Sequence, residues 1–152
     1  MPSPGDVLHY ENFVFDNGKV KNKFFIVLHD DPCLMLITTT QSLRYPMVEA
    51  IGCNPDKMTF FFPAGQQNVF TKPTYLVMQK IYELPRTEAQ GLIAVRRITK
   101  KRPLPAKVLG AIKDCLSHFR DDIADEHWDA IFKPNAPSAA SFQALAEKFK
   151  RK

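Results

Sequence analysis

The sequence predicts a mainly β protein with C-terminal helices, in which helices pack on a small antiparallel barrel. Short apolar segments separated by turn residues run through residues 7–84, and such a series is typical of small barrels. Clear helical spacing begins only at residue 106. We therefore expect a barrel over residues 1–102 and a helical extension over 103–152, packed together as one domain.

The first hairpin is predicted at the Asp-Asn-Gly of residues 16–18, which follows a strand over residues 7–15. Asn and Gly tolerate the positive φ angles that tight hairpin turns require. After the turn, Lys19, Lys21 and Lys23 alternate with other residues, so a strand would place their ammonium groups on one side. Such a row can bind phosphate, or it can discourage pairing at the edge of a sheet.

Two apolar segments, residues 24–28 (FFIVL) and 34–40, form the predicted centre of the sheet. Shorter strands are expected at residues 48–51 and 59–62, and residues 74–84 are expected as one long strand or a bulged pair.

The other segments before residue 106 are connections and one last strand. Residues 52–57 read as a turn and residues 64–70 as a loop. Residues 87–91 fit a single helical turn, and residues 92–98 a final strand.

Three helices are expected at the C-terminal end. Residues 106–119 carry apolar side chains at helical spacing, and residues 125–132 fit a shorter helix that buries Trp128. A last helix, capped by Ser138 or Ser141, would end in a basic tail.

The net charge of +5 and the pI of 9.2 are compatible with a polyanionic partner. Five positive charges lie within seven residues, and they form either a phosphate contact or a solvated connector: Arg96, Arg97, Lys100, Lys101 and Arg102.

Three cysteines, Cys33, Cys53 and Cys115, are few and far apart. They indicate neither a disulfide framework nor a zinc site, so we expect a reducing compartment. The first residues lack the pattern of a secretory leader, and no apolar run approaches the roughly 20 residues of a membrane span. These observations predict a cytoplasmic protein without membrane contact.

Residues 34–46, LMLITTTQSLRYP, end a predicted strand with clustered hydroxyl and amide groups. Thr39, Thr40, Gln41 and Ser42 offer donors and acceptors that can hold a phosphate or a ribose hydroxyl without a metal. The alternative is that the threonines are simply good strand residues with one face exposed.

Several motifs in this order resemble the MazF/PemK/Kid family of toxin endoribonucleases. They are the Gly-Asp-Val of residues 5–7, the FFIVL strand, the Thr-Thr-Gln-Ser of residues 39–42 and Tyr45-Pro46. Residues 74–84, with Gln79, resemble the family's third conserved block, and the likeness covers residues 5–95 in outline.

The resemblance implies an SH3-like barrel that forms a homodimer and binds an antitoxin protein. It also implies cleavage of single-stranded RNA without a metal or cofactor, by attack of the ribose 2′-hydroxyl on the adjacent phosphate. Thr39 falls at the family's active-site threonine, and Lys23 falls where the family usually has its catalytic arginine. The remaining candidates are residues that would bind substrate: Thr40, Gln41, Ser42, Arg44, Lys19, Lys21 and Gln79.

Alternatives stay open because the sequence departs from the family in two places. Lys23 replaces the catalytic arginine, and Met78 and Leu76 stand where some members carry an acidic residue and a second arginine. His9 and His29 are possible substitutes for acid–base work. The chain could instead bind RNA or protein within the same family without cutting. It could also be an unrelated small barrel whose helical tail serves as an interaction module.

Overall fold

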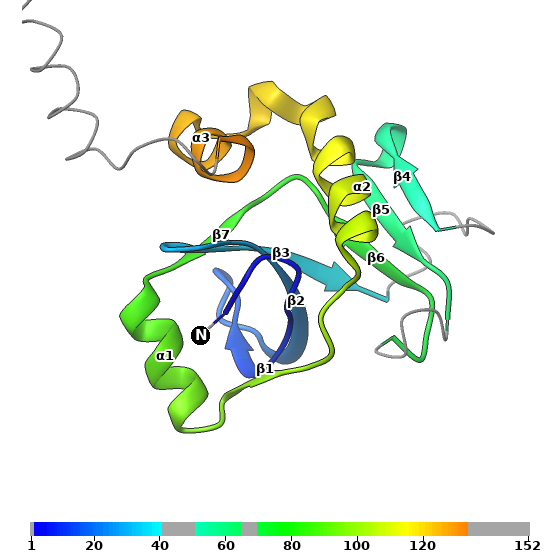
Figure 1. Cartoon of the computed structure of the whole chain (residues 1–152). Helices are drawn as coiled ribbons and strands as arrows, with labels where there is room; N and C mark the ends of the chain where they lie inside the picture. Colours follow the sequence, from blue (N-terminus) through cyan, green and yellow to red (C-terminus); the bar gives the residue numbers. More distant parts are fainter. Residues whose placement is uncertain (1, 41–50, 65–69, 134–152) are drawn as a thin grey trace, which may run out of the picture.

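The computed structural model describes residues 2–40, 51–64 and 70–133, whose strands form one antiparallel sheet (Figure 1). The strands are β1 (Val7–Val14), β2 (Val20–Asp30), β3 (Cys33–Thr39), β4 (Gly52–Asn54), β5 (Thr59–Phe62), β6 (Thr74–Val77), β7 (Tyr82–Leu84) and β8 (Ile98–Lys100). The helices are α1 (Arg86–Ala94), α2 (Ala106–Leu116) and α3 (Asp125–Phe132), with 3₁₀ helices η1 (Pro55–Lys57) and η3 (Ser117–Asp122).

The sheet follows the order β4-β5-β6-β3-β2-β1-β8, and β7 pairs with β3 off this path. The pairs between these strands are antiparallel. Within the described residues β4 and β8 end the path and do not pair with each other, so the sheet is not closed. The predicted β architecture with helices is confirmed, whereas the closed SH3-like barrel is not.

Residues 25–28 of β2 and most of β3 are buried on both faces. Phe25 and Val27 belong to one hydrophobic cluster, while Ile26 and Leu28 belong to another. Strands of this kind read as continuous apolar runs because neither face contacts water. Each face must therefore be covered by other elements.

Helices cover the two faces separately, as Figure 1 shows with α1 on one side of the strands and α2 and α3 on the other. Ala89 of α1 packs in the cluster with Phe25, and Ile112 of α2 and Ile131 of α3 pack in the cluster with Ile26. The C-terminal helices thus share their core with the sheet.

The predicted hairpin turn lies between β1 and β2. Gly18 has a φ of +85°, and the N–H of Phe15 donates to the carbonyl of Lys19 over 2.8 Å. The side-chain oxygen of Asn17 accepts from the N–H of Lys19 over 3.0 Å. This pairing extends β2 back to Val20, four residues before the apolar run begins.

One expected connection is regular structure instead. Residues 52–54, expected within a turn, form β4, because they pair with β5.

Residues 74–84, expected as one long strand or a bulged pair, form two short strands, β6 and β7, separated by residues 78–81. Both strands pair with β3, with Leu76 opposite Thr38 and Tyr82 opposite Met35. Three residues along β3 thus correspond to six along the partner segment, so the chain bulges out of the sheet between β6 and β7. This arrangement agrees with the second alternative.

The helices also differ from expectation near residue 90. The single helical turn is the nine-residue helix α1, and the strand expected at residues 92–98 is wrong because Leu92 and Ile93 belong to this helix and pack against the core. Helix α2 ends at Leu116 and continues as η3, where Phe119 has non-helical angles. The predicted helix over residues 125–132 is confirmed as α3.

Residues 48–50 of the strand expected at residues 48–51 lie outside the described residues, and so does the last helix with Ser138 and Ser141. Residue 51 is not part of a strand.

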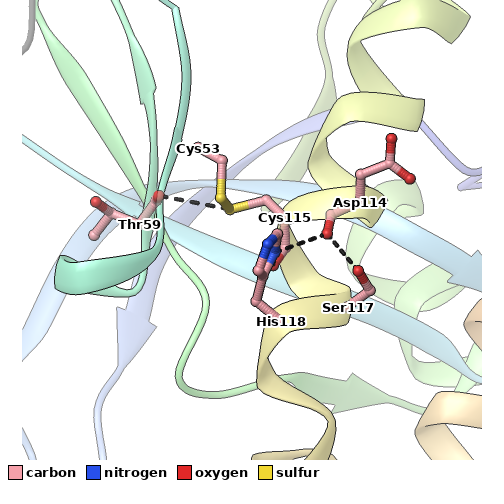
Figure 2. Close-up of a disulfide and its surroundings, with 6 residues drawn as sticks. All are labelled: Cys53, Thr59, Asp114, Cys115, Ser117 and His118. Atoms are coloured by element: carbon pink, nitrogen blue, oxygen red, sulfur yellow. Dashed lines mark hydrogen bonds between the residues drawn. A yellow bond between two sulfur atoms is a disulfide. The ribbon is translucent and has the colours of Figure 1, made fainter.

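A disulfide joins Cys53 of β4 to Cys115 of α2, across 62 residues of sequence (Figure 2). The expectation of no disulfide is therefore wrong, because sequence spacing does not reveal that α2 packs beside β4. Disulfides persist in oxidising surroundings, so cysteine usage no longer supports a reducing compartment. The sulfur of Cys115 also lies 3.7 Å from the carbonyl oxygen of Thr59, which would accept its proton in the thiol form.

Replacing both cysteines, with Cys53→Ser and Cys115→Ser, is expected to lower the free energy of unfolding by about 4 kcal/mol, because closing a loop of this size restricts the unfolded chain. Urea denaturation of the oxidised protein and the double variant measures the difference. As a control, a reductant should destabilise the wild type and leave the double variant unchanged. Coincident curves for the oxidised wild type and the double variant would show that the bond does not stabilise the fold.

Candidate functional site

An open cleft of about 350 Å³, here named the lysine cleft, lies beside the hairpin turn between β1 and β2. It crosses from the hairpin over β2 and β3 to the end of β6. Its lining is Phe15, Asn17, Lys19, Lys21, Lys23, Ile37, Thr38, Thr39, Val77 and Gln79. All three alternating lysines therefore face one cleft, as their spacing predicts.

Lys23 and Thr39 lie in the same cleft. Strands β2 and β3 pair as far as Phe25 and Ile37. Beyond this pair, the side chain of Lys23 reaches the carbonyl oxygen of Thr38, the residue next to Thr39. The two residues that the family resemblance assigns to catalysis thus both line the cleft.

Hydrogen bonds hold this end of the cleft in place. The ammonium Nζ of Lys23 donates to the carbonyl oxygen of Thr38 over 3.3 Å, and the hydroxyl of Thr38 donates to the carbonyl oxygen of Phe24 over 3.0 Å. Since an ammonium group has three N–H donors, Lys23 keeps donors for a ligand. Lys19 and Lys21 are exposed and make no side-chain hydrogen bond or ion pair with the described residues.

The lysine cleft carries positive charge without compensation, because no carboxylate lies among its lining residues in the described part of the chain. Burial lowers the pKa of Lys23 below its ordinary value, and the nearby charge of Lys21 lowers this pKa further. An anion placed between the lysines would relieve their mutual repulsion. The arrangement therefore suits a phosphate group.

An ion pair joins the two sides of the cleft. Lys80, next to Gln79, contacts Asp16 of the hairpin turn over 2.8 Å, and its ammonium also lies 4.7 Å from the ring centre of Tyr82. The hydrogen bond from Lys80 lowers the pKa of the Asp16 carboxyl. The side-chain nitrogen of Gln79 lies 3.5 Å from the sulfur of Met58, a weak acceptor that a ligand can displace.

The structure brings five of the predicted site residues into the cleft: Lys19, Lys21, Lys23, Thr39 and Gln79. Thr40 directly follows β3 and is exposed, but it does not line the lysine cleft. The predictions for Gln41, Ser42 and Arg44 lie outside the described residues.

Neither histidine proposed for acid–base work lines the lysine cleft. His9 packs against the ring of Phe24 at 4.9 Å, and Nδ1 of His29 lies 3.1 Å from the carbonyl oxygen of Pro32. Both therefore have structural contacts away from Lys23 and Thr39.

Two members of the basic run at residues 96–102 also support the fold. Arg97 donates to the carbonyl oxygen of Asn12 over 3.0 Å, at the irregularity in β1, and Lys100 pairs with the largely buried Asp6 over 3.3 Å. Arg97 and Lys100 therefore have contacts within the fold that neither of the two expected interpretations included.

The prediction missed the apolar part of the lining, Phe15, Ile37 and Val77. The alternation of β3 contained the signal for Ile37, since this residue lies two positions from Thr39 and so shares its face. No sequence signal placed Val77 there, because the pairing of β6 with β3 joins distant parts of the chain.

Comparison of the chain with models of known protein families gives no match, and comparison with curated proteins gives none either. None of the helices in the described part of the chain is both long enough and apolar enough to cross a membrane. The described residues also contain no cluster of three or more side chains suited to hold a metal ion. The function must therefore be argued from the cleft itself.

The pKa of Lys23 is expected to lie below the ordinary lysine value of 10.5, because the side chain is partly buried and lies near the ammonium of Lys21. NMR titration of the Lys23 side chain, assigned with the Lys23→Met variant, measures this pKa. The Lys21→Met variant should raise the pKa of Lys23 by removing a positive charge. A pKa of Lys23 at the ordinary value, or one unchanged in Lys21→Met, would contradict this account of the cleft.

Proposed function

We propose that this chain binds single-stranded RNA in the lysine cleft and cleaves it without a metal ion, as a divergent toxin of the MazF/PemK kind. The observation that carries the proposal is that three lysines line one cleft together with Thr39, and that the described lining contains no carboxylate. Neutralising phosphates supplies much of the affinity of proteins for nucleic acids.

The spacing of the lysines favours an extended strand over an isolated phosphate. Lys21 and Lys23 lie two residues apart on β2, so their backbones are roughly 6.6 Å apart. This is close to the distance between successive phosphates of an extended single strand. Phe15, Ile37 and Val77 add apolar contact area for sugars or unstacked bases.

The proposed reaction is a transesterification. The ribose 2′-oxygen forms a bond to the adjacent phosphorus, and the bond from phosphorus to the 5′-oxygen breaks, leaving a 2′,3′-cyclic phosphate and a 5′-hydroxyl. One proton leaves the 2′-hydroxyl to water and one is needed by the 5′-oxygen. Lys23, whose pKa is lowered by burial, donates that proton as general acid and is then reprotonated from solvent.

Thr39 and Gln79 would hold the phosphate oxygens during this step. Each offers a neutral donor at the rim of the cleft, Thr39 from the end of β3 and Gln79 from the segment after β6. The ammonium groups of Lys21 and Lys23 stabilise the additional negative charge that develops on the phosphorane.

The proposal includes the properties that the family resemblance implies. The antiparallel sheet would be a divergent SH3-like barrel, the protein a homodimer in the cytoplasm, and an antitoxin protein the inhibitor that covers the cleft. In a reducing cytoplasm Cys53 and Cys115 would be thiols, and the carbonyl of Thr59 provides an acceptor for one of them.

Incubation of the protein with a long single-stranded RNA in EDTA is expected to produce discrete cuts with 5′-hydroxyl ends. Lys23→Met should slow cleavage by about 10²-fold or more, the usual contribution of a general acid. Thr39→Val should also slow it. Lys107→Met removes an equal charge outside the cleft and should leave the rate unchanged. Equal rates for wild type and Lys23→Met would refute the assignment.

A second function, RNA binding without cleavage, is favoured by one specific observation. The described lining of the cleft contains no histidine or carboxylate that could remove the 2′-hydroxyl proton. Intact RNA that still binds in a Lys23-dependent manner would establish this alternative.

Binding to a 2′-O-methyl RNA, which cannot be cleaved, is expected to weaken with rising pH below the ordinary lysine pKa of 10.5. Lys23 loses its charge in this range because its pKa is lowered, whereas arginine stays charged. The Lys23→Arg variant should therefore keep its affinity to higher pH. Affinities measured between pH 7 and pH 10 by fluorescence anisotropy provide the comparison, and parallel curves would contradict it.

A further inference from the structure

A second cleft, of about 200 Å³, lies between the segment of residues 78–81 and the end of the helical extension. Its lining combines apolar side chains with Gln79, Lys80, Asp122 and His127. Gln79 lines both this cleft and the lysine cleft, so the two hollows adjoin across one side chain. A strand bound in the first can therefore extend into the second.

The two clefts differ in charge. Asp122 places a carboxylate in the second cleft and makes no hydrogen bond or ion pair with the described residues. The ammonium of Lys80 is already paired with Asp16. A phosphate would be repelled by Asp122 here, whereas a neutral group with N–H donors would be attracted to it.

The size and walls of the second cleft fit one heterocycle. Its volume is below the roughly 300–1,000 Å³ of clefts that enclose drug-sized ligands. Met78, Ile81 and Ile123 supply apolar surface, and Met78 and Ile123 also pack into the core beneath. Nε2 of His127 lies 3.1 Å from a carboxylate oxygen of Glu83, a residue outside the cleft lining. These contacts position the wall residues before any ligand binds.

We propose that the second cleft binds a guanine base of the RNA strand whose phosphate occupies the lysine cleft, with Asp122 accepting its N1–H and N2–H groups. Guanine alone among the four RNA bases presents two adjacent donors on its Watson–Crick edge, which match the two oxygens of a carboxylate. Unstacked bases of single-stranded RNA are usually recognised on this edge. The inference rests on the proposed RNA binding, and it gives the C-terminal helices a role in choosing the sequence.

The test compares two 2′-O-methyl oligonucleotides that differ in one base, guanine or hypoxanthine, which lacks the N2 amino group. The wild type is expected to bind the guanine form on the order of tenfold more tightly, as for a good pair of base contacts. Asp122→Asn should abolish this preference. Asp121→Asn, which changes the adjacent exposed residue outside the cleft, should retain it.

The Lys23→Met variant separates this inference from the proposed function. It should weaken binding of both oligonucleotides while leaving their ratio unchanged. Equal affinity of the wild type for both forms, or an unchanged preference in Asp122→Asn, overturns the guanine site but leaves RNA binding intact. Failure of the wild type to bind either oligonucleotide overturns both proposals.

Discussion

The pairing of β2 with β3 is the interaction on which the rest of the structure depends. The paired segments are buried on both faces, and fully burying a residue such as Phe25 or Ile26 contributes roughly 2 kcal/mol. The pairing ends at Phe25 and Ile37, two residues from Lys23 on one strand and from Thr39 on the other. Core packing therefore determines where the candidate site begins.

The lysine cleft lies at the ends of these strands because their sequences change character there. Strand β2 is apolar from Phe24 to Leu28 but polar from Lys21 to Lys23, where it extends beyond the core as part of the hairpin. Partial burial of Lys23 costs solvation free energy, which its bond to the carbonyl of Thr38 offsets only in part. The described lining of the cleft contains no carboxylate to offset this charge, which is the reason for proposing a bound anion.

Short stretches of sequence were sufficient to predict the strands, turns and helices that depend on neighbouring residues alone. Continuous apolar runs predicted β2 and β3, Asp-Asn-Gly predicted the hairpin turn, and helical spacing predicted α2 and α3. The lysine row was found because period-two alternation places side chains without knowledge of the fold. Thr39 was singled out by the cluster of hydroxyl groups and by the family resemblance. Local pattern failed where distant contacts decide, as at Leu92, which packs as helix, and at Cys53, which bonds to α2.

The break within residues 74–84 positions the candidate site, and the sequence left open whether this segment forms one long strand or a bulged pair. A continuous strand would have placed Gln79 and Lys80 in the sheet beside β3. Instead Met78 donates its N–H to the carbonyl of Met58, the chain leaves β3, and Gln79 stands between two clefts. The apolar residues on either side of the break keep it anchored, since Leu76 and Met78 belong to the core. Gln79 and Asp122 line the clefts and do not belong to this core, so substituting either residue is not expected to disturb the sheet that positions Lys23.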